Sequence, residues 1–362
     1  MSSTSMRVAV LGTGAIGLAS ISLLLSKGHE AVAWSPRGLL PAGPMLLTAE
    51  GALEHEATVE VAATCSEAVA GADAVLVTVS ATGYRTVLEA LAACLQAGQP
   101  VIISAQLSLG ALFLSRLLAR RGITAPIAAW GSTMLSGARL APNRVLLRNI
   151  RAEIDVAAVP RRDGEAMLDL CRTLFGDRFR LRDGLIAITL SNVNPQNHLA
   201  IAMCNLSRME NGEKWRQWAN TTTAVGRLME ALDAERLAIA ESFGVEVRNI
   251  RQHLHRSFHV PEGPVGEMAA QLAAGSSDPL GPATLESRYV LEDAPFGLPG
   301  TELLGRMCGR PAILHESGLK LISALYGRDF TAENDILPDL SLDKMDAALL
   351  QRMADEGWQE EP

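Results

Sequence analysis

The chain has 362 residues, of which 48% are hydrophobic and 20% are charged, and its formal net charge is −8. This length exceeds what one ordinary core accommodates and predicts two domains, while the composition is that of a folded globular protein and not of a disordered one. The charged residues form no basic block, so we expect neither nucleic acid nor an anionic membrane as a partner.

The first half of the chain alternates buried strands with amphipathic helices. Continuous apolar runs predict strands, and helical spacing of apolar residues predicts helices between them. Later strands are expected as an antiparallel extension of the sheet. Such alternation is typical of a parallel sheet with helices on both faces. The predicted strands lie at residues 7–11, 30–34, 74–79, 101–104, 127–130, 144–147 and 154–159, and the predicted helices at 15–27, 84–95 and 109–121.

A glycine-rich turn follows the first predicted strand directly and opens the first predicted helix. In this context a GxGxxG sequence indicates a dinucleotide-binding Rossmann fold. Gly12 permits the tight turn, Gly14 lets the backbone approach a pyrophosphate, and Gly17 lets the helix pack closely on the strand. Ala15 and Ile16 begin the helix, whose positive N-terminus would face the phosphates. The alternative is a tight turn whose glycines bind nothing.

The end of the second predicted strand indicates which nicotinamide cofactor binds. An NAD site usually places an acidic residue there to bind the ribose 2′-hydroxyl. Here the sequence reads Trp34-Ser35-Pro36-Arg37, with no acid. Ser35 can donate to a 2′-phosphate, and Arg37 can bind it with paired charge-assisted hydrogen bonds. We predict NADP as the cofactor, with NAD as the alternative if Arg37 is only a solvated loop residue.

The pattern changes after about residue 182, where β-branched runs end and helical periodicity takes over. We therefore predict an α/β fold in two parts: an NAD(P)-binding Rossmann domain at residues 1–183 and an all-helical substrate-binding and catalytic domain at residues 184–362. The helices of the second domain are expected at residues 184–209, 219–243, 265–274 and 312–326.

His198 lies in an apolar stretch of this helical half, four residues after Asn194. Asn194 followed by Pro195 is a helix-start signal, so the helix predicted at 184–209 should break or kink there. Residues four apart share a helical face. A lone histidine on an apolar helix is more often a core residue, but its asparagine neighbours favour a functional site, and a histidine suits a general acid or base.

Three segments resemble the opine dehydrogenases, the family of the octopine, nopaline and N-(1-carboxyethyl)norvaline dehydrogenases. The resemblance runs in order from the glycine turn to about residue 330. It implies a Rossmann domain, then an all-helical domain, with the active site in the cleft between them. The segments are residues 189–198 (TLSNVNPQNH), 222–243 with LDAERLAIA at 232–240, and 281–293 (GPATLESRYVLED).

Position by position, this resemblance implies roles for four residues. His198 matches the family's catalytic histidine, and Asp293 the aspartate that orients it. Arg288 matches an arginine that holds a keto-acid carboxylate, and Thr222 a threonine near the substrate; Asn194, on the face of His198, is expected to contact substrate as well. Taken alone, Arg288 and Asp293 would be interpreted as a surface ion pair, and Thr222 as a packing residue.

The resemblance implies condensation of an amino acid with a 2-oxo acid such as pyruvate, by a nicotinamide-dependent oxidoreductase that acts on CH–NH bonds; the choice of NADPH rests on Ser35 and Arg37 and not on the resemblance. Which amino acid binds is not carried over, and some members have an aspartate where this chain has Ser35. A ketopantoate-reductase-like or 3-hydroxyacid dehydrogenase is the first alternative, but such enzymes use a lysine at the start of the helical domain. The sequence has no lysine between Lys27 and Lys214. A non-catalytic NADP-binding regulatory protein is the second alternative.

The remaining histidines and cysteines predict no metal site. His253, His255 and His259 are spaced so that neighbours point apart on a helix, and no carboxylate or cysteine completes a ligand set. The five cysteines are far apart and form no CxxC pair, so we expect buried free thiols in a reducing cytoplasm. The first residues lack the pattern of a signal peptide, and apolar helix faces in the second domain predict a homodimer.

Overall fold

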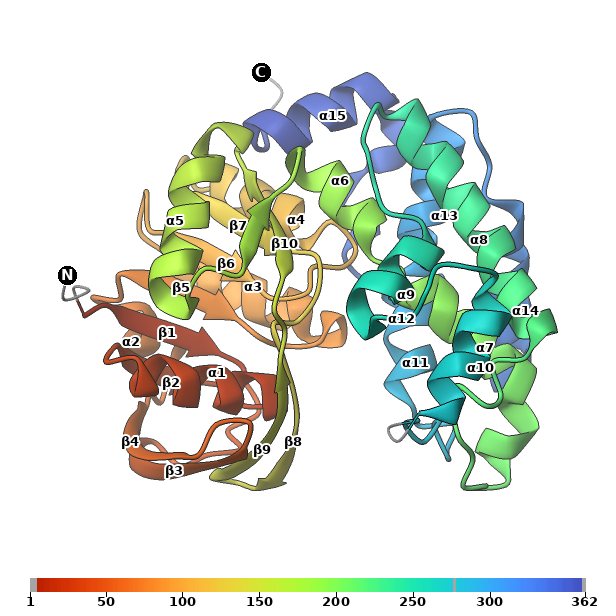
Figure 1. The fold of residues 1–362 in the computed structure, drawn as a ribbon. Helices are drawn as coiled ribbons and strands as arrows, with labels where there is room; N and C mark the ends of the chain where they lie inside the picture. Colours follow the sequence, from red (N-terminus) through yellow and green to blue (C-terminus); the bar gives the residue numbers. More distant parts are fainter. Residues whose placement is uncertain (1–4, 276–277, 360–362) are drawn as a thin grey trace. The chain divides into compact units, whose positions relative to one another are not determined.

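The computed structural model describes residues 5–275 and 278–359, which form two compact units. The first unit holds the chain up to Thr189 together with the segment that begins at Leu350, and the second runs from Leu190 to Leu349 (Figure 1). The sequence had predicted the boundary six residues earlier, at 183/184, and a helical domain that reached the C-terminus.

Contacts within the first unit explain these differences. Most of helix α6 (Gly184–Ser191) belongs to the Rossmann unit, where Gln106 Nε2 donates to Thr189 Oγ1 at 2.9 Å. The C-terminal segment returns to the same unit. There Trp358 N donates to Ser115 Oγ at 2.8 Å, and the Arg116 guanidinium lies 5.2 Å from the centre of the Trp358 ring.

In the described part of the chain, eleven strands form one sheet in the order β11-β10-β7-β6-β5-β1-β2-β4-β3-β9-β8. Its six middle strands, β4-β2-β1-β5-β6-β7, are parallel to one another. They have the order of a dinucleotide-binding fold, which reverses on either side of the first strand. The strands are β1 (Arg7–Leu11), β2 (Glu30–Trp34), β3 (Gly43–Gly51), β4 (His55–Val61), β5 (Ala74–Val77), β6 (Val101–Ile103), β7 (Ile127–Trp130), β8 (Leu135–Ala141), β9 (Arg144–Ile150), β10 (Ile154–Val159) and β11 (Phe179–Leu181).

Every strand predicted from the sequence is present, and β10 pairs antiparallel with β7 as expected. Strands β3, β4, β8 and β11 were not predicted. In β3 and β4 exposed and partly buried residues alternate over much of the length, because these strands lie toward one side of the sheet. The weaker apolar signal of such strands explains why a search for continuous apolar runs passes over them.

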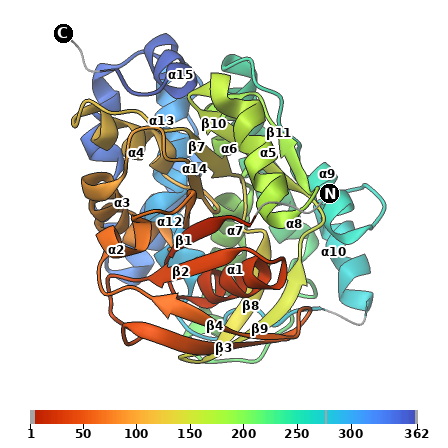
Figure 2. The same cartoon turned by 90° about the vertical axis from the view of Figure 1, so that its left-hand side faces the viewer.

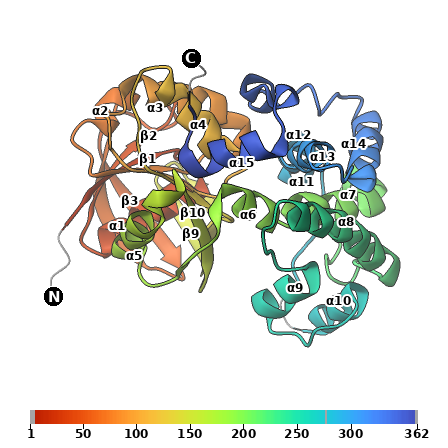
Figure 3. The same ribbon diagram turned by 90° about the horizontal axis from the view of Figure 1, so that it is seen from above.

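Helices cover both faces of the parallel part of the sheet. Figures 2 and 3 show α2, α3 and α4 on one face and α1 and α5 on the other. The core includes Trp130, whose ring centre lies 5.5 Å from that of Phe175 and 5.0 Å from that of Phe179. These helices are α1 (Ala15–Ser26), α2 (Cys65–Val69), α3 (Tyr84–Cys94), α4 (Gly110–Ala119) and α5 (Gly164–Phe175). The last helix, α15 (Ala347–Glu356), begins in the second unit and belongs for most of its length to the first.

Over its described residues the second unit is built from helices, so the predicted fold class, a Rossmann domain and an α-helical domain, is confirmed. The expected break is present, because α6 ends at Ser191 and α7 begins at Asn194. No helix in the described ranges has the length and apolar character needed to cross a membrane. The helices are α7 (Asn194–Glu210), α8 (Thr223–Ser242), α9 (Ile250–Phe258), α10 (Val265–Ala274), α11 (Arg288–Leu291), α12 (Asp293–Phe296), α13 (Leu298–Met307) and α14 (Ile313–Tyr326).

A buried ion pair ties three of these helices together. Arg236 on α8 binds Asp233 Oδ1 through Nε at 3.0 Å and through a terminal nitrogen at 2.7 Å, and both residues are 2% exposed. Gln196 on α7 donates to Asp233 Oδ1 at 2.8 Å, and the first backbone N–H of α9, at Ile250, donates to Asp233 Oδ2 at 2.8 Å. Arg236 also donates to the carbonyl of Leu190, beside the α6–α7 break. The break is therefore fixed by the buried charge pair.

Candidate active site

The glycine turn between β1 and α1 meets the steric requirements predicted for it. Gly12 has φ +119°, and a Cβ on it would lie 2.8 Å from Oγ1 of Thr78, the residue that directly follows the neighbouring strand β5. A Cβ on Gly17 would lie 1.8 Å from the Gly12 carbonyl oxygen. Both positions therefore require glycine for reasons internal to the fold.

Gly14 differs, because a Cβ there would meet no protein atom within 4 Å. Space in front of this residue is what the approach of a pyrophosphate to the backbone needs. Ala15 and Ile16 form the first turn of α1, whose leading N–H groups lack partners within the helix,. Thr13 Oγ1 is buried and has no hydrogen-bond partner among the described residues. The turn thus fits a dinucleotide phosphate.

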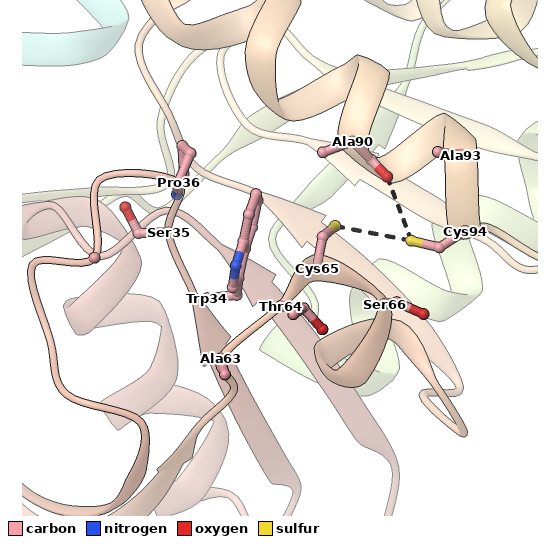
Figure 4. Close-up of a pocket in the computed structure, with 11 residues that line it drawn as sticks. Trp34, Ser35, Pro36, Ala63, Thr64, Cys65, Ser66, Ala90, Ala93 and Cys94 are labelled. Atoms are coloured by element: carbon pink, nitrogen blue, oxygen red, sulfur yellow. Dashed lines mark hydrogen bonds between the residues drawn. The ribbon is translucent and has the colours of Figure 1, made fainter.

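Beside this turn, the ends of β2 and β4 border a cavity of about 610 Å³ (Figure 4). Ser35 lines it and also lines an adjoining cavity of about 210 Å³ that reaches Thr13. Arg37 is exposed on the same loop, between the lining residues Pro36 and Gly38. The larger cavity is lined by Trp34, Ser35, Pro36, Gly38, Ala63, Thr64, Cys65, Ser66, Ala90, Ala93 and Cys94.

Two cysteines meet in the wall of this cavity. The side chains of Cys65 on α2 and Cys94 on α3 point toward one another (Figure 4). Their Sγ atoms lie 3.9 Å apart, and Cys94 Sγ also lies 3.4 Å from the Ala90 carbonyl oxygen. Burial, followed by the neighbouring Cys94 thiol, raises the pKa of Cys65 far above its usual range. All five cysteines are free, but the expectation that all are buried is wrong, because Cys204 is exposed.

In the helical unit, α7 and α12 bring His198 and Asp293 together. His198 Nδ1 lies 2.6 Å from Asp293 Oδ2, and the two side chains are 14% and 4% exposed. A carboxylate at this distance favours the neutral tautomer with the proton on Nδ1, in which Nε2 has a free lone pair. No hydrogen bond to Nε2 is made by any residue that the structure describes. The arrangement can accept a proton at Nε2 and stabilise the cation that forms.

The local sequence explains where His198 stands. Asn192 Oδ1 accepts a hydrogen bond from Asn194 N at 3.0 Å and so satisfies the start of α7, with Pro195 in its first turn. The sequence predicted Asn194 itself as the cap; the cap acceptor is instead Asn192, two residues earlier. Asn194 is the first residue of the helix and is half-buried, one turn before His198.

The two other expected substrate residues are exposed. Thr222 caps α8, accepting from Val225 N at 3.5 Å. Arg288 begins α11 with a side chain that is 63% exposed and forms an ion pair with Glu292 at 3.2 Å. An ion pair between Arg288 and Asp293, the alternative for these residues, is thus not the arrangement found.

Sequence reasoning missed one residue that contacts His198, Tyr289, and the hydrogen-bond partner of that residue, Gln217. The Tyr289 ring stacks on the imidazole with centroids 3.7 Å apart and planes inclined by 12°. Gln217 accepts a hydrogen bond from the Tyr289 hydroxyl at 2.8 Å. Tyr289 directly follows Arg288 in a segment that the resemblance already marked, so an aromatic residue beside two expected site residues was the available signal.

The three histidines near α9 are separately placed. His255 Nδ1 lies 2.7 Å from the Val260 carbonyl oxygen, and His259 ends the helix in a left-handed conformation. Within residues 5–275 and 278–359, no group of three or more His, Cys, Asp or Glu side chains could hold a metal ion.

Comparisons with known proteins agree with both halves of the chain. A family model for the alpha-helical domain of NAD/NADP octopine/nopaline dehydrogenase matches residues 181–326, and one for NADP oxidoreductase, coenzyme F420-dependent, matches residues 7–106. An opine dehydrogenase from Arthrobacter sp. (strain 1C) is 28% identical over 361 residues, covering 94% of this chain and 96% of that protein.

Solved structures show the same fold. Octopine dehydrogenase with NADH and L-arginine superposes with a TM-score of 0.77 at 15% identity, covering 99% of this chain and 100% of that one. Yersinopine dehydrogenase with NADP⁺ bound superposes with a TM-score of 0.67 at 15% identity, covering 98% and 99% of the two chains. The chain therefore resembles opine dehydrogenases over nearly its whole length, and residues 181–326 match the α-helical domain of that family. Opine dehydrogenases are NAD(P)-dependent oxidoreductases that act on CH–NH bonds, so the predicted resemblance and enzyme class are confirmed.

A cofactor bound beside the glycine turn should shield Cys94 from a maleimide, because Cys94 lines the neighbouring cavity and is partly accessible. Mass spectrometry after timed labelling, with and without NADPH, measures the rate at each thiol. Cys94 should react more slowly with NADPH present, and Cys65 slowly in both cases because so little of it is thiolate. Cys204, exposed on α7, is the matched control and should react at one rate. If Cys94 were labelled at the same rate with and without NADPH, this cavity would not be part of the cofactor site.

Proposed function

We propose that this protein condenses an amino acid with a 2-oxo acid such as pyruvate and reduces the product with NADPH to a secondary amine. The observation that carries the proposal is the His198–Asp293 pair, held within the helical domain of a chain whose other domain carries the glycine turn. Octopine dehydrogenase has been solved with NADH and L-arginine and with NADH and pyruvate, which supports this pair of substrate classes.

His198 performs the proton transfers of this reaction. An amino acid's ammonium must lose a proton before its nitrogen can attack a carbonyl carbon, and Nε2 of His198 takes that proton while Asp293 stabilises the imidazolium. The same proton returns to the carbinolamine hydroxyl, which leaves as water and gives an iminium. The bound nicotinamide supplies the hydride that reduces it.

Arg288 binds the carboxylate of the oxo acid. Its planar guanidinium matches a carboxylate with two parallel hydrogen bonds, and its present partner Glu292 would give way to the substrate. The Arg288 side chain is 63% exposed and can reorient, whereas the Glu292 side chain is only 12% exposed, so the exchange costs more than the loss of a surface ion pair,. Thr222 and Asn194 are proposed as further substrate contacts.

NADP is the proposed cofactor, with the pyrophosphate on Gly12, Gly14 and Gly17 and the 2′-phosphate on Ser35 and Arg37. The absence of an acidic residue at the end of β2 supports this preference, because a carboxylate would repel the phosphate,. NAD remains the alternative that titration distinguishes.

Two further properties are proposed. Free cysteines throughout the chain support a reducing compartment, the cytoplasm,. Leu314, Leu321 and Leu325 are exposed at helical spacing on α14, which supports a homodimer through the helical unit,. Sedimentation at micromolar concentration, showing monomer alone, would contradict the dimer.

NADPH should bind more tightly than NADH. Loss of one charge-assisted contact to the 2′-phosphate costs about 1.5–3 kcal/mol, roughly 10- to 150-fold in affinity. Fluorescence titration of both cofactors measures this, and Arg37→Asp should reverse the preference. Arg120→Asp, at the exposed end of α4, is the charge-matched control and should leave it unchanged. NADH binding as tight as NADPH binding in the unmodified protein would contradict the assignment.

Oxidation of NADPH should require an oxo acid and an amino acid together, and His198→Ala should lower kcat by roughly 10²–10⁴, the usual effect of a positioned acid or base. The assay is a screen of common amino acids with pyruvate, in which the oxidation of NADPH is followed by the loss of the absorbance of its reduced nicotinamide. Affinity for NADPH should persist, and His255→Ala, a histidine on α9, is the control.

Arg288→Ala should act differently, by raising the KM for the oxo acid, since it removes carboxylate binding. Arg306→Ala is its control, because that exposed arginine likewise forms an ion pair of i,i+4 spacing with a buried carboxylate, that of Glu302. Rapid oxidation with the oxo acid alone, yielding a hydroxy acid, would contradict the opine reaction and favour a hydroxyacid dehydrogenase. A protein that binds NADPH but oxidises it with no substrate pair would be the regulatory alternative.

A further inference from the structure

His198 is held in two independent ways. The hydrogen bond from Nδ1 to Asp293 acts at one edge of the imidazole ring, at 2.6 Å. Tyr289 acts on its face, with ring centroids 3.7 Å apart and an interplanar angle of 12°. The three residues lie on α7, α11 and α12 of the same unit (Figure 1).

The two contacts restrict different motions. A single hydrogen bond favours one nitrogen as the carrier of the proton, but it only weakly restricts the tilting of the ring about the line from Nδ1 to the carboxylate oxygen that the side-chain torsions of His198 allow. Such tilting would sweep Nε2, the atom proposed to take the substrate's proton, through an arc. A flat ring packed against the face of the imidazole prevents this motion because the tilting would drive one ring into the other.

Tyr289 is itself fixed at its far end. Its hydroxyl donates to Gln217 Oε1 at 2.8 Å, and Gln217 is 8% exposed. The Gln217 backbone N–H in turn donates to the Pro279 carbonyl oxygen at 2.8 Å. Burial raises the pKa of the Tyr289 phenol, against the lowering influence of Arg288 and of the Gln217 hydrogen bond, so the hydroxyl remains protonated and can donate.

We propose that Tyr289 is a positioning residue for His198: its ring sets the plane of the imidazole, and Gln217 holds Tyr289 in place. The inference rests on the proposed function, since it assigns the stacked ring a role in the same proton transfer. The aromatic face also favours the imidazolium that forms when Nε2 takes a proton, because a cation is attracted to the centre of an aromatic ring.

Two substitutions separate the ring from the hydroxyl. Tyr289→Phe keeps the ring and removes the hydrogen bond to Gln217. It should lower kcat by less than about 5-fold, the change expected from the loss of one hydrogen bond between uncharged groups. Tyr289→Leu removes the ring and should lower kcat by roughly 10²-fold, as misplacement of a reacting group does. NADPH affinity should be unchanged in both. Equal losses in the two variants, or no loss in Tyr289→Leu, would overturn the proposal.

A double-mutant cycle tests whether Tyr289 acts through His198. In a His198→Ala background, Tyr289→Leu should cause no further loss, because there is no imidazole left to position. The same fold-loss in both backgrounds would mean that Tyr289 acts independently and would overturn the proposal.

Ring-current shifts keep the test independent of activity and of the proposed function. In NMR spectra the carbon-bound protons of the His198 ring should resonate upfield of their usual position in the unmodified protein and in Tyr289→Phe, and should return toward it in Tyr289→Leu. Normal shifts in the unmodified protein would contradict the stack.

Normal kinetics in Tyr289→Leu, in a protein that does condense the two substrates, would refute the positioning role alone. A folded protein with the upfield shifts but with no activity toward any substrate pair would refute the proposed function instead.

Discussion

A buried pair of charges, Asp233 with Arg236, fixes the position of His198. Two ions in a protein interior lose their hydration, and only their mutual attraction and a full set of hydrogen bonds compensate for that loss. Here Asp233 accepts from Gln196 and from Ile250 N, and Arg236 donates to the backbone carbonyls of Leu190, near the end of α6, and of Arg248, in the loop before α9. Apolar residues of the same size would leave these backbone groups unsatisfied. The pair therefore determines where α6 ends and where α7 and α9 begin.

The geometry of the site depends on the helix ends that this ion pair binds. Gln196, which the ion pair holds, is two residues from His198 on the same short stretch of helix. Asp293 then fixes the edge of the imidazole and Tyr289 its face. A proton acceptor so constrained is ready before substrate arrives, and pre-organisation of this kind lowers the barrier because little reorientation is needed during the reaction. The Rossmann unit contributes the glycine turn, whose N–H groups at the start of α1 are the proposed binding site for a cofactor phosphate,.

Sequence reasoning predicted the features that depend on local chemistry. A glycine turn between an apolar strand and a helix, and an asparagine-proline pair inside a helical stretch, determine the backbone by themselves, and both occur where expected. Features that depend on contacts distant in sequence were not predicted from local patterns. Asp293 was identified through the family resemblance and not through any spacing, since it lies 95 residues from His198. Tyr289 and Gln217, 72 residues apart, have no local signal that would pair them.

The most direct test of this account concerns the protons on the His198 ring. With histidine labelled by ¹⁵N in the imidazole, and with the His198 signals assigned by their loss in His198→Ala, NMR reports which ring nitrogen carries hydrogen. The account predicts a protonated Nδ1 and an unprotonated Nε2 in the neutral ring, and a loss of this preference in Asp293→Asn, whose amide can donate to Nδ1. A neutral ring protonated at Nε2 in the unmodified protein would contradict the account, because the nitrogen proposed to receive the substrate's proton would already carry one.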